Sequence, residues 1–390
     1  MATVESNQAS VTTSHARIRI RIGDTQKQIG PDRLDDLLPQ ARTLLDPDIE
    51  RGVKEEIERV RSHGLGEACS EIISIAQALA PAGHRLELLG PPVSLKLFHL
   101  AGLTHFDPLE YRFQTDAWLP ISDTVNPPAP WALPASPSRH IGVTVSMAPA
   151  DLVTFFRLRG YAIRSERFSY EKVNYRDLCF DQITAKQYPS TPDHQTVILL
   201  VSTDALTRLA AAVTPEESIV CLRDTQTFHL LAAADTDGLG PLRYPEIKRL
   251  LRQRRPSSLE ELAALLDGVC DTRRPRADQE EFVYLEDLLL ELNETLGISL
   301  SDARATYSLI GLKTGGDKHR GWIVERAISR GMDAAAAEAF WSRLCRLAKN
   351  RAAASRTQLI PLAHKCLRAA FLKAHYPAHF RAILAAEGPG

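Results

Sequence analysis

The stretch Leu372-Lys373-Ala374-His375-Tyr376-Pro377-Ala378-His379-Phe380 lies near the end of a chain of 390 residues. It combines apolar and aromatic side chains with a lysine and two histidines, and Pro377 interrupts a pattern that is otherwise typical of a helix. The stretch belongs to a longer segment, 339–386, that contains no Asp or Glu and nine Lys and Arg residues. A basic, helical segment is therefore the first feature that the sequence predicts.

Positive charge is concentrated in two parts of a chain whose net charge is −1. One is the segment 339–386, and the other is a cluster from Lys248 to Arg255. One-signed segments of this kind suit a polyanion such as a nucleic-acid backbone. Solvated helix faces and contacts with an acidic partner protein are alternative interpretations.

Composition is that of an ordinary globular protein, with 44% hydrophobic and 24% charged residues. No apolar run reaches the roughly 18 residues that cross a bilayer, and the N-terminus lacks the basic-then-apolar order of a signal peptide. We therefore expect a cytoplasmic protein without a membrane partner. The six cysteines contain no Cys-x-x-Cys pair, which argues against a structural zinc site and a disulfide framework.

The first half of the chain combines strand and helix patterns. Residues 16–22 alternate strictly between apolar and basic side chains, which is the period of a half-buried strand. A β-type run over 140–145 and the apolar run 196–201 predict two more strands, the second buried on both faces. Helices are expected over the ranges 32–45, 48–62, 66–80, 94–102 and 149–159.

Two other stretches limit the expected domains. Residues 1–15 are polar and rich in Ser and Thr, so we expect them to be disordered. The stretch 118–138 contains six prolines and is expected to be a linker or a loop that runs over the protein surface. Beyond Thr214 the pattern becomes mostly helical, with breakers such as Gly297 and Pro377. The sequence thus predicts an α+β protein with a helical second half.

The stretch 372–380 resembles the end of the fingers domain in the bacterial C-family DNA polymerases, the family of the DNA polymerase III alpha subunit. A second block, Gly102-Leu103-Thr104-His105-Phe106-Asp107-Pro108-Leu109-Glu110-Tyr111, is similar to this family's Gly-Ile-Thr-x-x-Asp-Pro-Leu motif in the palm. Weaker matching blocks occur in the family's own order, among them 248–262, 283–287 and 311–313. Their shared order is what makes the resemblance specific.

The resemblance implies a division into domains. Residues 16–213 would form a nucleotidyltransferase-like palm with the proline-rich stretch 118–138 as an insertion. The family's thumb would be largely missing, because only 180–196 is left for it. Residues 214–390 would form a mostly helical fingers-like domain. DNA becomes the expected partner, together with another polymerase or a replication or repair protein.

The family's catalytic aspartates hold two Mg²⁺ ions that activate the primer 3′-hydroxyl and stabilise the leaving pyrophosphate. Alignment with the family places two of these positions at Gly142 and Thr144, which alternate along one strand. The third falls on Ser202. None of these side chains replaces a carboxylate as a Mg²⁺ ligand, so the resemblance implies a palm without catalytic residues and without a metal cofactor.

The nucleotide-binding positions of the family also differ. Leu88 stands where a turn of the family carries an arginine that cradles the triphosphate, and Ser94 alone matches that turn. Tyr307 and Ser308 replace paired arginines of the fingers. The family's Asn-Lys-Ser-His block reads Ser355-Arg356-Thr357-Gln358, which leaves Arg356 as a basic remnant.

The sequence leaves three functions open. The first is a catalytically inactive relative of the polymerase III alpha subunit that binds DNA or a replication or repair partner. The second is an active nucleotidyltransferase whose Mg²⁺ ligands come from Asp151, Asp177, Asp181 or Asp204. The third is a helical protein–protein adaptor without affinity for DNA. For the first, the expected nucleic-acid-binding residues are Lys248, Arg249, Arg252, Lys313, Arg343, Arg346, Lys349, Arg351, Arg356 and Arg368.

Overall fold

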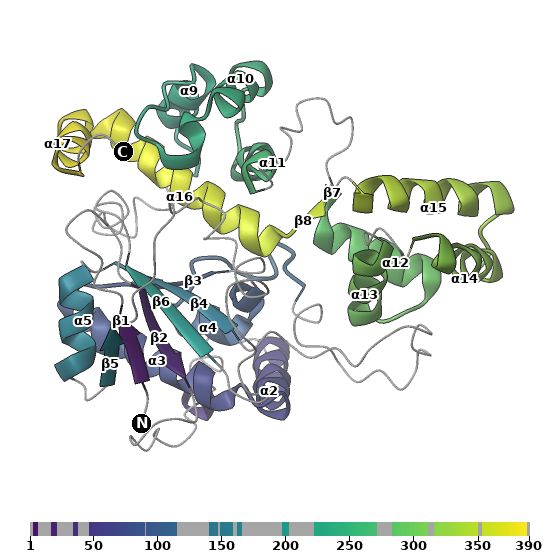
Figure 1. Cartoon of the computed structure of the whole chain (residues 1–390), viewed down its shortest axis with the longest axis horizontal. Coiled ribbons are helices and arrows are strands. Elements are labelled where there is room, and N and C mark those ends of the chain that lie inside the picture. Colours follow the sequence, from purple (N-terminus) through teal and green to yellow (C-terminus); the bar gives the residue numbers. More distant parts are fainter. Residues whose placement is uncertain are drawn as a thin grey trace. The chain divides into compact units, whose positions relative to one another are not determined.

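The fold of the chain is given by a computed structural model (Figure 1). It describes residues 3–6, 17–21, 34–37, 47–89, 91–114, 140–146, 149–158, 162–165, 197–202, 222–270, 283–310, 316–349 and 353–387. The chain divides into two compact units. The sheet unit comprises Met1–Asp107, Arg139–Asp278 and Thr357–Gly390, and the helical unit comprises Pro108–Ser138 and Gln279–Arg356.

The sheet unit contains a six-stranded mixed sheet in the order β3-β4-β6-β2-β1-β5. Two neighbouring strands, β4 (His140–Val145) and β6 (Val197–Ser202), run parallel to each other, as Figure 1 shows. β3 (Leu86–Leu89) pairs antiparallel with β4, and β2 (Arg17–Arg21) pairs antiparallel with β6. The strands expected over 16–22, 140–145 and 196–201 are thus confirmed.

The two remaining strands extend the sheet on one side. β1 (Thr3–Ser6) pairs antiparallel with β2, and β5 (Ala162–Ser165) pairs parallel with β1. We expected disorder over 1–15, whereas β1 lies within this segment and is held by backbone pairing on both sides. The proline-rich stretch 118–138 lies outside the described residues.

Alternation along β3 separates two faces of the sheet. Leu86 and Leu88 pair with positions 145 and 143 of β4, where both valines are buried, as are the two leucines themselves. Glu87, between the leucines, pairs with Thr144 and therefore belongs to the opposite face. One face of this strand pair thus belongs to the hydrophobic core, whereas the other carries a carboxylate.

Four helices of the sheet unit confirm the sequence pattern. The ranges expected over 48–62, 66–80, 94–102 and 149–159 correspond to α2 (Pro47–Ser62), α3 (Gly66–Leu79), α4 (Lys96–Leu100) and α5 (Pro149–Leu158). Each has an apolar face whose burial stabilises the helix; the buried side chains include Val53, Ile72, Phe98 and Phe156. Within the range 32–45, the structure describes only the 3-10 turn η1 (Leu34–Leu37).

A buried carboxylate on α2 fixes the beginning of α4. The Glu56 oxygens accept hydrogen bonds from the backbone N–H groups of Lys96, at 3.1 Å, and Leu97, at 2.8 Å. Such N–H groups at the start of a helix have no partner within it. Burial raises the pKa of Glu56 to about 7, although both hydrogen bonds act to lower it. Glu56 is therefore a cap for α4 supplied from a distant part of the sequence.

A second group of helices in the sheet unit comes from the middle of the chain. It consists of α9 (Thr225–Ala232), the 3-10 turn η6 (Gly240–Arg243), α10 (Pro245–Arg254) and α11 (Leu259–Cys270). Apolar side chains from all three helices are buried between them, including Leu231, Leu251 and Leu262. We expected these residues to form one domain with the later helices, but they belong to the compact unit that contains the sheet.

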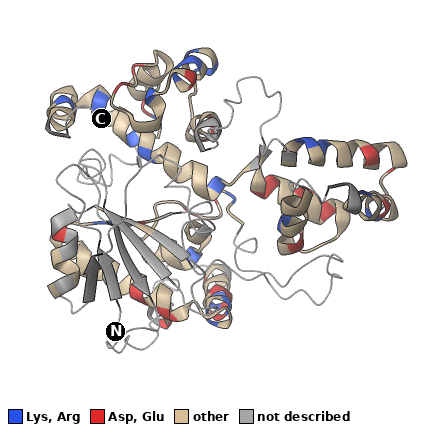
Figure 2. Cartoon of the chain, viewed as in Figure 1, with Lys and Arg blue, Asp and Glu red and all other residues tan. Residues whose placement is uncertain are grey.

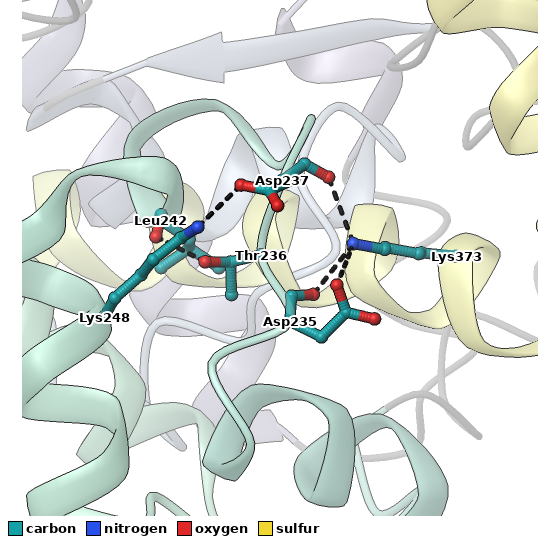
Figure 3. Close-up of polar contacts among 6 residues, drawn as sticks. All are labelled: Asp235, Thr236, Asp237, Leu242, Lys248 and Lys373. Carbon is teal, nitrogen blue, oxygen red and sulfur yellow. Dashed lines mark hydrogen bonds and ion pairs between the residues drawn. The ribbon is translucent and has the colours of Figure 1, made fainter.

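The stretch 372–380 begins in α16 (Arg356–His375) and continues into α17 (Pro377–Glu387). Pro377 separates the two helices, as expected for a residue that cannot donate a backbone hydrogen bond but suits a first helical turn. Lys373 binds the loop after α9, as Figure 3 shows. Its Nζ donates to Asp235 Oδ1 at 2.6 Å, Asp235 O at 3.0 Å and Asp237 O at 3.1 Å.

The same loop is held from the other side by α10. Lys248 Nζ donates to Asp237 Oδ1 at 2.6 Å, so the loop is bonded to both α10 and α16 (Figure 3). Phe380 of α17 is 2% exposed and lies against Gly238, where φ is +80° and a Cβ would come within 2.5 Å of Leu384. The stretch 372–380 is therefore a packing and hydrogen-bonding element that joins α16 and α17 to the α9–α10 region.

The helical unit is a small bundle. It contains α12 (Leu285–Leu296), α13 (Leu300–Ile310), α14 (Gly316–Ser329) and α15 (Ala334–Lys349), with a two-stranded parallel pair of β7 (Val283–Tyr284) and β8 (Ala353–Ala354). Its core includes Leu292, Ile323 and Leu344, none of which is exposed. Gly297 ends α12 with φ +62°, so the expected breaker is confirmed.

The mostly helical character expected for 214–390 is confirmed over the described residues. Residues beyond 213 occur in both units, and the boundary at 213 stays a prediction. The hydrogen bonds from Lys373 to the 235–237 loop lie within the sheet unit and join α16 to the α9–α10 region. The palm-like arrangement of the sheet stays a prediction. Among the described helices, none is both long and apolar enough to cross a membrane.

Candidate nucleic-acid interface

α10 presents a group of exposed arginines. Pro245 occupies the first helical turn, and Ile247, Leu250 and Leu251 form the buried face of the helix. The remaining positions point away from this face. Four exposed residues, which we call the α10 arginines, are Arg249, Arg252, Arg254 and Arg255.

The α10 arginines occupy the last two turns of the helix and its C-terminal cap. Arg249 and Arg252 are three residues apart and therefore lie on the same side of the helix. Arg255 ends the helix in the left-handed region, with φ +47°. Cations near the C-terminal end of a helix interact favourably with its dipole. The local structure thus tolerates several positive charges at one end of α10.

No intramolecular acid neutralises this group in the part of the chain that the structure describes. The α10 helix has a single acidic residue, Glu246, which is exposed in its first turn. Lys248 is ion-paired with Asp237, whereas the side chains of the four α10 arginines have no hydrogen bond or ion pair to any described residue. Figure 2 shows the resulting concentration of positive charge on α10. Exposed guanidinium groups of this kind can donate two hydrogen bonds to one phosphate.

Three other arginines that we expected at the interface are engaged inside the protein. Arg343 is ion-paired with Glu291 at 2.6 Å. Arg356 is ion-paired with Asp287 at 2.6 Å and lies 3.9 Å from the centre of the Tyr284 ring. These contacts hold both side chains within the helical unit. The expectation of a free phosphate-binding role is therefore not met for either residue.

Arg368 is the third, and it is the most buried of the expected interface residues described. Its side chain is 8% exposed, and its Nη1 lies 3.4 Å from Glu87 Oε1 on β3. Arg346 on α15 is exposed but also has an intramolecular contact. The side chains of Lys349, Lys313 and Arg351 lie outside the described residues. Of the expected set, the structure brings Arg249 and Arg252 together on one surface.

The positions expected to match the family's aspartates lie on the neighbouring strands β4 and β6. Thr144 pairs with Val201 of β6 and with Glu87 of β3. Ser202 pairs with Val145, one residue further along. Because paired positions share a face, 142 and 144 lie on one face and 202 on the other. Ser202 is thus not on the same face as Gly142 and Thr144, and the β6 positions that pair with these two residues are Leu199 and Val201.

The carboxylates considered as substitutes do not form a site in the described residues. Asp151 is exposed in the first turn of α5, where an acidic residue suits the helix dipole. Asp177, Asp181 and Asp204 lie outside the described residues. Among described side chains, no group of three or more His, Cys, Asp or Glu residues could hold a metal ion.

The positions expected to match the family's nucleotide-binding residues have structural contacts here. Leu88 is buried on the core face of β3, and Ser94 is buried at the end of the 3-10 turn η3 (Pro91–Ser94). Tyr307 Oη donates to Leu347 O at 3.3 Å, and Ser308 Oγ donates to Arg304 O at 2.9 Å. Each described side chain at these positions is used for packing or for an intramolecular hydrogen bond.

Comparison with models of known protein families and with curated proteins found no match.

Several polar residues that the sequence does not single out are prominent in the structure. Arg254 and Arg255 were counted in the basic cluster but not chosen as binding residues, although both are exposed beside Arg252. Arg85 and His99 carry no sequence signal, because neither belongs to a recognisable spacing pattern. Their buried nitrogens become visible only after folding.

Proposed function

We propose that this protein is a non-catalytic relative of the C-family DNA polymerases that binds a nucleic-acid backbone through the α10 arginines. The observation that carries the proposal is the set of four exposed arginines on α10 without an acidic partner among the described residues. Contacts from such a surface are directed at phosphates, so the binding is independent of base sequence and sensitive to salt.

The polymerase relationship is supported by residue order and by the chemistry of the sheet. The blocks at 102–111 and 372–380 resemble the family, and 140–145 and 197–202 form adjacent parallel strands. The positions of this strand pair lack carboxylates at 142 and 144. Two-metal nucleotidyl transfer needs acidic oxygen ligands at such a site. A binding role without catalysis therefore fits these residues better than nucleotidyl transfer.

The binding part of the proposal is tested by a salt titration of DNA affinity. We expect the double variant Arg249→Gln/Arg252→Gln to bind DNA more weakly than the unmodified protein. The slope of log K against log [salt] should decrease by about 1.8 for duplex DNA, or about 1.4 for a single strand, if each arginine contacts one phosphate.

The matched control is the double variant Arg51→Gln/Lys54→Gln. These two residues are also exposed, also three positions apart and also on a helix, α2, so both double variants change the net charge equally. We expect the control to retain the slope of the unmodified protein. An equal loss in both variants would mean that α10 is not a binding surface, and no DNA affinity at all would favour a protein–protein adaptor.

The non-catalytic part is tested by primer extension with Mg²⁺ or Mn²⁺. We expect no nucleotide incorporation above a buffer control. Robust incorporation that is abolished in Asp204→Ala or Asp151→Ala would overturn this part of the proposal and would identify the active carboxylate.

A further inference from the structure

Tyr244 is an exposed aromatic residue at the start of α10, with 38% of its surface accessible to solvent. Its backbone oxygen accepts a hydrogen bond from the N–H of Lys248 at 2.9 Å, and Pro245 begins the helix after it. The Tyr244 side chain has no hydrogen bond or ring contact to any described residue. The start of α10 therefore depends on the backbone of Tyr244 and on Pro245, and it leaves the tyrosine ring unused within the described part of the protein.

Tyr376 occupies the equivalent position at the start of α17, in different surroundings. Both tyrosines directly precede the proline that begins a helix, and both are 38% exposed. The centre of the Tyr376 ring lies 6.5 Å from that of Phe371 and 6.4 Å from that of His379. Tyr376 thus belongs to an aromatic group of the protein itself. Tyr244 has no such neighbour among the described residues, so its ring is available to a partner molecule.

Exposed guanidinium groups lie before and after Tyr244 in the chain. Arg243 directly precedes it, and Arg252 follows two helical turns later. Neither arginine side chain has a hydrogen bond or ion pair to a described residue. Tyr244, Lys248 and Arg252 are spaced four residues apart, so they follow one side of α10 over about 12 Å. The tyrosine ring therefore belongs to the same basic surface as the α10 arginines.

Two carboxylates near this surface leave its positive charge in excess. Asp237 accepts a hydrogen bond from Lys248 Nζ at 2.6 Å, so these two charges balance each other (Figure 3). Glu246 is exposed, but it is two residues from Tyr244 and does not share its side of the helix. Arg243 and the four α10 arginines outnumber this single carboxylate. The surface around Tyr244 consequently suits a chain of phosphates.

An exposed aromatic ring among cations is the arrangement that binds unpaired bases. The ring stacks on the face of a base, while neighbouring cations contact the phosphates of the same strand. In a duplex, the faces of the bases are covered by stacking on one another, so an aromatic side chain at the surface cannot reach them. The arginines alone bind either form of nucleic acid, whereas the tyrosine ring contributes only to a single strand.

We propose that Tyr244 stacks on an unpaired base and that α10 is a binding site for single-stranded nucleic acid. Arg243 and Arg252 contact phosphates of the strand whose base lies on Tyr244. Because every base has an aromatic face, the site accepts any sequence. This inference rests on the proposed function, since it takes the α10 arginines as the phosphate contacts, and it adds the form of nucleic acid that the surface binds.

The inference is tested by fluorescence anisotropy of the full chain with three labelled probes. These are oligodeoxythymidylate, an abasic strand of the same length and a duplex of the same length. The first two carry the same phosphates, so the difference between their affinities measures contacts to bases. We expect oligodeoxythymidylate to bind more tightly than the abasic strand. Tyr244→Ser should weaken its binding by about 5- to 100-fold and leave binding of the abasic strand and the duplex unchanged.

Tyr376→Ser is the matched control, because Tyr376 has the same exposure and the same position before a helix. It should bind oligodeoxythymidylate as tightly as the unmodified protein does. Tyr244→Phe keeps a ring that can stack, so it should retain most of the affinity. Serine is a favourable residue at the start of a helix, and Tyr244→Ser should therefore keep the melting temperature of the unmodified protein. Its weaker binding would then report a lost contact and not a lost fold.

Three results would overturn the inference. The first is equal affinity of the unmodified protein for oligodeoxythymidylate and the abasic strand. The second is an equal loss of single-strand affinity in Tyr244→Ser and Tyr376→Ser. The third is an equal loss of single-strand and duplex affinity in Tyr244→Ser, which would mean that Tyr244 contacts the backbone.

Failure of this inference can be distinguished from failure of the proposed function. Each of the three results would leave the salt titration of Arg249→Gln/Arg252→Gln unaffected, so backbone binding through α10 would stand. Absence of binding to all three probes would instead remove the proposed function, and the stacking role of Tyr244 with it.

Discussion

The arginines of α10 and the arginine of α16 have the same chemistry in opposite surroundings. Arg249 and Arg252 are exposed and have no partner among the described residues, whereas Arg368 is 8% exposed and faces Glu87. Both groups belong to basic parts of the sequence. The difference shows that a basic segment is not by itself an interface. Its exposed charges are available to a partner molecule, whereas its buried charges form ion pairs within the protein.

The largest effect expected from this comparison is on stability. Arg368→Met should lower the free energy of unfolding by about 2 to 3 kcal/mol, because it removes the ion pair between Arg368 and the partly buried Glu87. Arg252→Met should change it by less than about 0.5 kcal/mol, as expected at an exposed position. Urea unfolding followed by circular dichroism, in phosphate-free buffer, measures both. Equal losses of unfolding free energy in the two variants would mean that the buried Arg368 contributes no more to stability than the exposed Arg252.

A second contrast concerns the two lysines that bind the 235–237 loop. Lys373 is 15% exposed and donates three hydrogen bonds, so Lys373→Met should lower the free energy of unfolding by about 2 kcal/mol. Lys248 makes one ion pair with a carboxylate that is 83% exposed, so Lys248→Met should have little measurable effect. Thermal unfolding of the two variants checks this order. A larger loss in Lys248→Met would reverse our assignment of the anchoring residue.

A smaller, pH-dependent effect separates buried from exposed histidines. The pKa of His364 falls from 6.5 to about 3 on folding, so the unfolded chain takes up a proton first as the pH falls. Stability from this residue is complete above pH 6.5 and is lost as the pH falls toward 3, by at most about 1.4 kcal/mol per pH unit. His364→Leu should flatten the stability profile below pH 6.5.

The control for this prediction is His379→Leu, because His379 is exposed on α17. Its profile should follow that of the unmodified protein. Identical profiles for the two variants, measured by urea unfolding between pH 5 and 8, would show that His364 does not titrate differently in the folded state.

Much of the local structure could be predicted because the relevant signals are local. The alternation in 16–22, the apolar run at 196–201 and the break at Pro377 each correspond to an observed element. These patterns depend on neighbouring residues, which impose a period of two or remove a backbone donor. Glu56 is a counterexample, since its role as a cap for α4 depends on residues 40 positions away.

The candidate sites were predicted less completely, because they depend on which side chains meet after folding. Charge density pointed to both Arg252 and Arg368, and nothing in the local sequence separates an exposed arginine from one that pairs with Glu87. The sequence also does not specify the register in which β4 and β6 pair. A shift of one residue in this register moves a side chain from one face of the sheet to the other. This explains why Ser202 was grouped with Gly142 and Thr144, whereas the pairing of Val145 with Ser202 separates them.

The bonds from Lys373 to the 235–237 loop also bear on the order of folding. They join residues 136 and 138 positions apart, and the pair of Glu87 and Arg368 spans 281 positions. Because a chain is synthesised from its N-terminus, the α9–α10 loop and the polar face of β3 leave the ribosome long before their partners on α16. Until then, the Asp235 and Glu87 carboxylates lack these cations. Completion of the sheet unit is therefore a late, long-range event, and it should be slower than formation of the helical unit.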